Sequence, residues 1–103
     1  MKKGQVIMKA RLAESYEILN IMKFIKENSV RIPGLSESDS FQEYKATIME
    51  YIMRGEANLI YFNNKIIGLS VQSSNEADSF YALANSLDNA MYDGAMSLLK
   101  EAV

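Results

Sequence analysis

The chain has 103 residues, a net charge of −2, 49% hydrophobic residues and 23% charged residues. This balance predicts one globular domain, residues 1–103, and excludes a disordered chain. Cysteine and histidine are both absent, which excludes disulfides, a thiolate nucleophile, an imidazole base and a Cys/His zinc site. We expect no metal, and no nucleic-acid partner because the basic residues are scattered.

The first residues, MKKG, are basic like the start of a signal peptide, but Lys9 and Arg11 interrupt the apolar run that would have to follow. No stretch is long enough for a membrane helix, so we expect a cytoplasmic protein. Residues 5–12 alternate between apolar and polar positions, which predicts a strand. Its apolar face would carry Val6, Met8, Ala10 and Leu12.

Residues 15–28 predict a helix, because Ile18, Ile21, Met22 and Ile25 recur at helical spacing. Ser15 is the expected N-cap. Charged residues fill the other positions and indicate a solvent-exposed face; they are Glu14, Glu17, Lys23, Lys26 and Glu27.

Residues 29–39 form a connector with a Pro33-Gly34 turn. Ser40 and Glu43 have the spacing of a capping box and predict the start of a second helix. Gly55 is placed to end this helix in a left-handed conformation. The expected buried stripe is Phe41, Tyr44, Ile48, Tyr51 and Ile52.

Residues 58–62 and 65–72 are rich in β-forming residues and flank Asn63-Asn64, which predicts a hairpin because Asn tolerates positive φ. Gly68 within the second run indicates a bulge or a close backbone approach. A polar turn follows at residues 73–78.

Residues 79–84 fit either a third hairpin strand or the start of a helix, and we favour the strand because a polar turn precedes it. Residues 87–103 predict a helix with an apolar stripe at Leu87, Met91, Ala95, Leu98, Leu99 and Ala102. The fold class is therefore α+β, a mainly antiparallel sheet with helices packed on it in the order β-α-α-β-β-β-α.

This order resembles the first half of the GNAT superfamily, the acetyl-CoA-dependent N-acyltransferases. The residues that carry the resemblance are the basic opening strand in MKARLAE, the strand pair containing Lys65-Ile-Ile-Gly-Leu, and the last helix GAMSLLKEAV, residues 94–103. In that family the start of this helix binds the pyrophosphate of the cofactor. A usual member continues with another strand, a fourth helix and two closing strands.

The cofactor loop of the family reads Gln/Arg-x-x-Gly-x-Gly/Ala, and Ala95 fits its last position because Leu98 and Leu99 then come into register. Ala90 then stands at the Gln/Arg position and Asp93 at the middle glycine. At about 4 Å and an effective dielectric of about 20, a carboxylate and a phosphate repel by roughly 4 kcal/mol. A helix terminus offers an anion only about 0.3–1 kcal/mol, so we expect no normal acetyl-CoA binding.

The register that ends on Gly94 instead places Asn89 at the lead and a tyrosine at the middle glycine, and it also departs from the pattern. No catalytic residue is assigned. If the family loop still works, the resemblance implies acetyl-CoA as the cofactor. The implied cofactor-binding residues are Asn85, Asn89, Gly94, Ala95 and Met96.

Three hypotheses follow: a GNAT-like domain impaired in catalysis, a non-enzymatic module that binds a protein or small ligand, or an unrelated α+β domain if residues 79–103 are all helical. An open sheet edge after the last strand would allow a homodimer. Glu56 is expected to be a solvated carboxylate, and Asp78 and Asp88 are expected in turn or N-cap roles.

Overall fold

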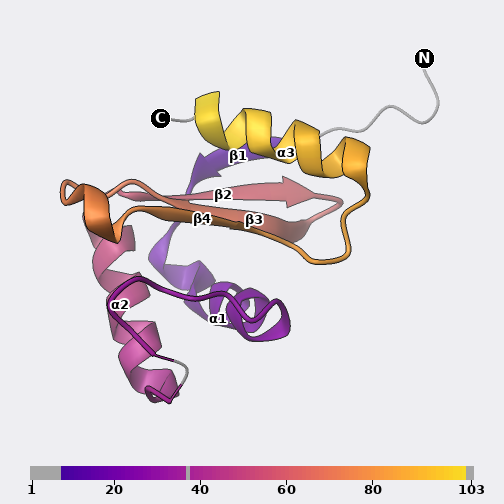
Figure 1. The fold of residues 1–103 in the computed structure, drawn as a ribbon. Coiled ribbons are helices and arrows are strands. Elements are labelled where there is room, and N and C mark those ends of the chain that lie inside the picture. The colour runs from indigo at the N-terminus through magenta and orange to yellow at the C-terminus, as the bar shows by residue number, and fades with distance from the viewer. Residues whose placement is uncertain (1–7, 37, 102–103) are drawn as a thin grey trace.

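The computed structural model describes residues 8–36 and 38–101. A four-stranded sheet lies between one helix on one face and two on the other (Figure 1). The strands are β1 (Lys9–Leu12), β2 (Ala57–Phe62), β3 (Lys65–Val71) and β4 (Phe80–Leu83). The helices are α1 (Ile18–Glu27), α2 (Phe41–Met53), α3 (Asn89–Glu101) and the short 3-10 turns η1 (Ser15–Glu17) and η2 (Glu76–Asp78).

The strand order in the sheet is β1-β2-β3-β4, and every neighbouring pair is antiparallel. The predicted α+β class and the predicted order of elements are both confirmed. Residues 80–83 form a strand, so the alternative in which residues 79–103 are entirely helical is wrong. No helix among the described residues has the length and apolarity needed to cross a membrane.

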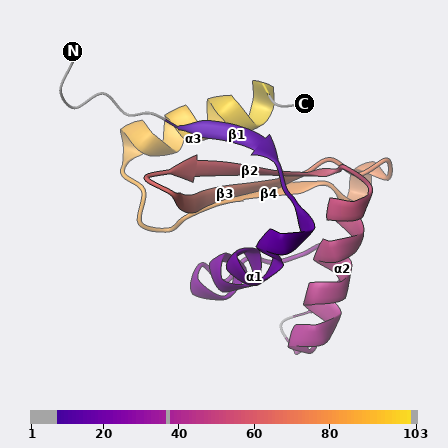
Figure 2. The same ribbon diagram turned by 180° about the vertical axis from the view of Figure 1, so that it is seen from behind.

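The two faces of the sheet carry separate cores. Figures 1 and 2 show α1 and α2 on one face and α3 on the other. The larger core joins α1 and α2 to the sheet through residues such as Ile21, Ile48 and Leu59, which are fully buried. The smaller core joins α3 to the sheet through Ile60, Ile67, Ala95 and Leu99. Alternate residues of one strand therefore serve different cores.

Turns and caps form where the local sequence predicts them. The Ser40 hydroxyl accepts a hydrogen bond from the Glu43 N–H at 3.2 Å and caps α2. Gly34 has φ of 88° and follows Pro33, as in a type II turn. Asn63 and Asn64 both have positive φ and close the β2–β3 hairpin.

Both long helices before the hairpin end in a left-handed residue. At the end of α2 this residue is Gly55, with φ of 71°, and the Glu56 N–H donates to the Tyr51 carbonyl at 2.9 Å. At the end of α1 it is Ser29, with φ of 51°, and the Val30 N–H donates to the Ile25 carbonyl at 3.0 Å. Both are Schellman-type ends, and only the first uses glycine.

Gly68 marks both a bulge and a close approach. The β2–β3 register shifts between Ile60 and Tyr61, so Ile67 of β3 has no partner of its own. A Cβ atom at Gly68 would lie 2.9 Å from Cδ2 of Leu83 and 3.3 Å from Cβ of Ile60. A side chain at Gly68 would therefore require the Leu83 side chain to shift.

Several sequence expectations are wrong in detail. Ser15 is not an N-cap, because η1 already begins at this residue. Leu12 was placed on the apolar face of the first strand and Phe41 on the buried stripe of the second helix, yet they are 54% and 50% exposed because no described element covers them. Helix α3 begins at Asn89 rather than at Leu87. The predicted core positions Val6 and Ala102 lie outside the described residues.

Candidate functional site

The connection between β4 and α3 is the segment where the family resemblance implies a cofactor loop. The Ala84 N–H donates to the Ile67 carbonyl at 2.9 Å and continues the β3–β4 pairing by one residue. The Asn85 N–H then donates to Oδ1 of Asn28 at 2.8 Å, and Nδ2 of Asn85 lies 3.5 Å from the Asn28 carbonyl. The connection is therefore attached to the carboxyl end of α1.

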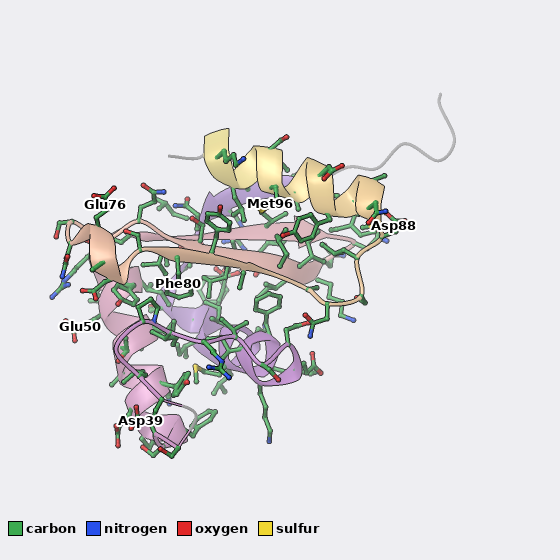
Figure 3. All side chains as sticks on the ribbon, in the orientation of Figure 1. Asp39, Glu50, Glu76, Phe80, Asp88 and Met96 are labelled. Carbon is green, nitrogen blue, oxygen red and sulfur yellow. The ribbon has the colours of Figure 1, made fainter. Side chains whose placement is uncertain are left out.

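Asp88 caps the start of α3. Its Oδ1 accepts a hydrogen bond from the Met91 N–H at 2.9 Å, and its carbonyl accepts one from the Tyr92 N–H at 2.8 Å. Figure 3 shows Asp88 at this end of the helix. The predicted N-cap role of Asp88 is confirmed, and a carboxylate occupies the position where a helix N-terminus would receive an external anion.

The structure separates the five implied cofactor residues. Asn85 lies in the connection beside α1, and Asn89 is the exposed first residue of α3. Gly94, Ala95 and Met96 lie further inside α3, where backbone N–H groups donate to carbonyls four residues earlier. Ala95 is fully buried in the smaller core, and Met96 packs against that core beside the sheet (Figure 3). No finding tests these five residues as a cofactor site, so the assignment stays a prediction.

A cleft of about 560 Å³ lies on the other face of the sheet, between α1, the β2–β3 turn and the connection after β4. Its apolar lining residues are Phe24, Ile66, Ile67 and Ala84. Charged and polar side chains line the rest; they are Asn20, Lys23, Glu27, Asn28, Tyr61, Asn64, Lys65 and Ser86. Within residues 8–36 and 38–101, the charges of Lys23, Glu27 and Lys65 take part in no ion pair.

An ion pair between the exposed Arg11 and the buried Glu17 lies next to Tyr61, which also lines this cleft. Arg11 of β1 donates to both carboxylate oxygens of Glu17, at 2.9 and 2.5 Å. The Tyr61 hydroxyl also donates to this carboxylate. The Glu14 N–H donates to it as well, at 2.9 Å. The Arg11 guanidinium lies 4.6 Å from the centroid of the Tyr61 ring. The network joins β1, β2 and η1.

The network shifts the pKa of each member. Burial alone would raise the pKa of Glu17, but the hydrogen bonds from Arg11, Tyr61 and the Glu14 backbone lower it from 4.5 to about 2. Burial and the Glu17 carboxylate raise the pKa of Tyr61 to about 12. The hydrogen bond to Glu17 raises the pKa of Arg11. Near neutral pH the Glu17 carboxylate is charged and its partners are protonated, so the network can hold β1, β2 and η1 in a fixed arrangement.

Sequence reasoning placed Glu17 on a solvent-exposed helix face, and this was wrong because the side chain is only 2% exposed. A possible signal was the spacing of Arg11 and Glu17 across the strand-to-helix junction. Glu56 was expected to be solvated, yet its Oε1 is buried and has no hydrogen-bond partner among the described residues. Asp78 accepts from Nδ2 of Asn75 at 3.2 Å, which fits its expected turn role.

No cluster of three or more Asp or Glu side chains that could hold a metal occurs in residues 8–36 and 38–101. No protein-family model and no curated protein sequence matches the chain. Among solved structures, the chain is similar to the acetyltransferase of GNAT family from Streptococcus pneumoniae, with 17% identity and a TM-score of 0.59. The match covers 93% of this chain and 65% of that protein.

Proposed function

From the premise that the fold is GNAT-like, we propose that this chain is an acetyltransferase-related domain that does not hold acetyl-CoA in the manner of the family and does not transfer acetyl groups. The single observation that carries the proposal is the Asp88 cap of α3. The connection that would cradle a pyrophosphate in this fold ends in a carboxylate bonded to the helix N-terminus.

The electrostatics of this arrangement oppose a pyrophosphate. The Met91 N–H, one of the amides that a phosphate would need, is already bonded to Asp88. Asp93 lies one turn further along the same helix and is exposed. A carboxylate at about 4 Å from a phosphate costs roughly 4 kcal/mol at an effective dielectric of about 20. That exceeds the roughly 0.3–1 kcal/mol offered by the helix terminus.

The backbone after Asp88 is also helical where the family motif needs a loop. Ala90 stands at the Gln/Arg position of the motif and lies in the first turn of α3. A pyrophosphate loop with the family spacing would therefore require this turn to unwind.

Isothermal titration calorimetry with acetyl-CoA tests the proposal. We expect no binding to the wild-type chain at millimolar cofactor, and binding in the micromolar range would overturn the proposal. The double variant Ala90→Arg, Asp93→Gly supplies the arginine at the first position of the family motif and the glycine at its middle position. We expect this variant to gain affinity for acetyl-CoA if Ala95 is the last residue of the motif. No gain in a variant that still folds would contradict this register.

Two substitutions at Asp88 distinguish the effect of its negative charge from the effect of its N-cap hydrogen bond on acetyl-CoA affinity. Asp88→Asn removes the negative charge and keeps an N-cap side chain, whereas Asp88→Ala removes both. We expect acetyl-CoA affinity in the Ala90→Arg, Asp93→Gly background to rise with Asp88→Asn, because repulsion of the phosphates decreases. An unchanged affinity would show that the Asp88 charge does not oppose the cofactor.

The cleft beside α1 favours a second candidate function, a non-enzymatic module that binds a small polar ligand. Its volume of about 560 Å³ fits the usual range for ligand sites. Its charges of both signs at Lys23, Glu27 and Lys65 would complement a zwitterion. Glycylglycine titrated into 15N-labelled protein should shift amide signals near Asn64 and Ser86, and Lys65→Ala should weaken the shifts. Shifts that Lys65→Ala leaves unchanged, or no shifts, would refute this candidate.

A further inference from the structure

The outer edge of β4 has backbone groups that no described residue pairs. β4 is the last strand of the sheet, and β3 pairs with it on one side only. The Ala84 N–H points to β3, because it donates to Ile67. Backbone groups of an antiparallel strand alternate in direction, so Phe80 and Ala82 also face β3. The N–H and C=O groups of Tyr81 and Leu83 therefore point outward.

This edge lacks the features that usually prevent strand pairing. Edge strands are commonly protected by charged residues, proline, bulges or a covering element. Residues 80–83 read Phe-Tyr-Ala-Leu and include neither a charge nor a proline. In Figure 1 the helices lie above and below the sheet, and none of them covers the β4 edge. The side chain of Tyr81 is 52% exposed on the α3 side.

We propose that a second copy of this chain pairs with this edge, β4 against β4 in antiparallel orientation about a two-fold axis at Ala82. In this register Tyr81 faces Leu83 of the partner subunit, and Leu83 faces Tyr81 of the partner subunit. The outward N–H and C=O groups of each residue bond to those of the residue opposite. The two four-stranded sheets become one continuous sheet of eight strands.

Side-chain positions make this edge complementary to itself. Leu83 packs with the smaller core on the α3 side, and Tyr81, two residues before it, lies on the same side. Each Tyr81 ring would cover a Leu83 side chain across the seam, an aromatic–aliphatic pair that occurs twice. The two Ala82 residues face each other at the axis, where a small side chain fits the close approach of a non-hydrogen-bonded pair.

A four-residue edge is short compared with the interface of an obligate dimer. We therefore expect a reversible dimer whose population rises with protein concentration. Sedimentation equilibrium of the 103-residue chain should show a monomer–dimer equilibrium. A strict monomer up to millimolar concentration would overturn the proposal.

Tyr81→Pro removes one outward N–H from each copy and leaves the bonds between β4 and β3 intact. We expect this variant to be monomeric with an unchanged circular dichroism spectrum. Tyr81→Thr is the matched control, because it removes the ring and keeps the N–H, and we expect a weakened dimer. A folded Tyr81→Pro variant that dimerises like the wild type would contradict the pairing.

Disulfide trapping tests the register directly and is not affected if Tyr81→Pro fails to fold. The chain contains no cysteine, so a single introduced thiol can pair only between copies. Residues that face each other as the two Ala82 residues do have Cα atoms about 4.5 Å apart, within disulfide range. Ala82→Cys should cross-link on mild oxidation. Tyr81→Cys should not, because its two copies would be about 7–8 Å apart on the diagonal. The reverse result, or cross-linking of neither variant, would refute the register.

Discussion

Replacing Glu17 by glutamine tests the ion pair that joins β1, β2 and η1. The carboxylate is buried and accepts hydrogen bonds from Arg11, from Tyr61 and from the Glu14 backbone. Glutamine has nearly the same shape, but it removes the negative charge. Its amide also places a donor where the carboxylate had only acceptors. We therefore expect a loss of stability without a change of fold.

The magnitude follows from the pKa of Glu17, which falls from 4.5 to about 2 in the fold. At about 1.4 kcal/mol per pH unit, this difference corresponds to about 3 kcal/mol in favour of the folded, charged form. Because the folded pKa is the lower one, this stability is fully present above pH 4.5. It is lost as the pH falls from 4.5 toward 2, where the carboxylate becomes protonated in both states.

Urea unfolding of wild type and Glu17→Gln at a series of pH values measures the effect. We expect Glu17→Gln to lower the free energy of unfolding by about 2–3 kcal/mol at pH 7 and by far less near pH 2. Glu50→Gln is the matched control, because Glu50 pairs with Arg54 at 2.8 Å in an exposed setting and should contribute little. An equal loss at both pH values, or no loss at pH 7, would refute the reasoning.

Three further substitutions test backbone geometry, each measured as a change in the free energy of unfolding. Ser29→Gly should stabilise the fold by about 0.5–1 kcal/mol, because Ser29 has φ of 51° at the end of α1; a loss of stability would contradict this. Gly55→Ala should cost about 1 kcal/mol at φ of 71°, and a neutral result would argue against the left-handed end. Gly68→Ala should cost about 1–3 kcal/mol by contact with Leu83. In a Leu83→Ala background, Gly68→Ala should cost less than it does in the wild type, because the contact is already removed. If the two substitutions have strictly additive effects on the free energy of unfolding, the contact is excluded.

The predicted elements were confirmed where the information lies within a few residues. The Ser40 cap, the Pro33-Gly34 turn and the Asn63-Asn64 hairpin each depend on local backbone geometry. The resemblance of the element order to the GNAT superfamily was also visible before the structure, and the similarity to a solved GNAT-family acetyltransferase supports that fold. Residue spacing carries this information because helices and strands have fixed periods.

Burial could not be deduced in the same way, because it depends on which elements meet. Leu12 and Phe41 fit apolar stripes, yet they are exposed where no described element covers them. Glu17 fits a charged helix face, yet Arg11 and Tyr61 enclose it after β1, β2 and η1 assemble. The spacing of apolar residues identifies which face of a helix or strand is apolar, but it does not identify which other element packs against that face.

The residues at the start of α3 show the same difference between what the local sequence predicts and what tertiary packing decides. The sequence by itself determined that Ala90 and Asp93 depart from the cofactor motif, and it predicted a helix over residues 87–103, of which α3 spans Asn89–Glu101. Only the tertiary structure decided that α3 lies on the sheet face opposite α1 and α2 and that Ala95 is buried there. The physical reason is that a helical period is local, whereas the face of the sheet that a helix covers depends on packing across the whole chain.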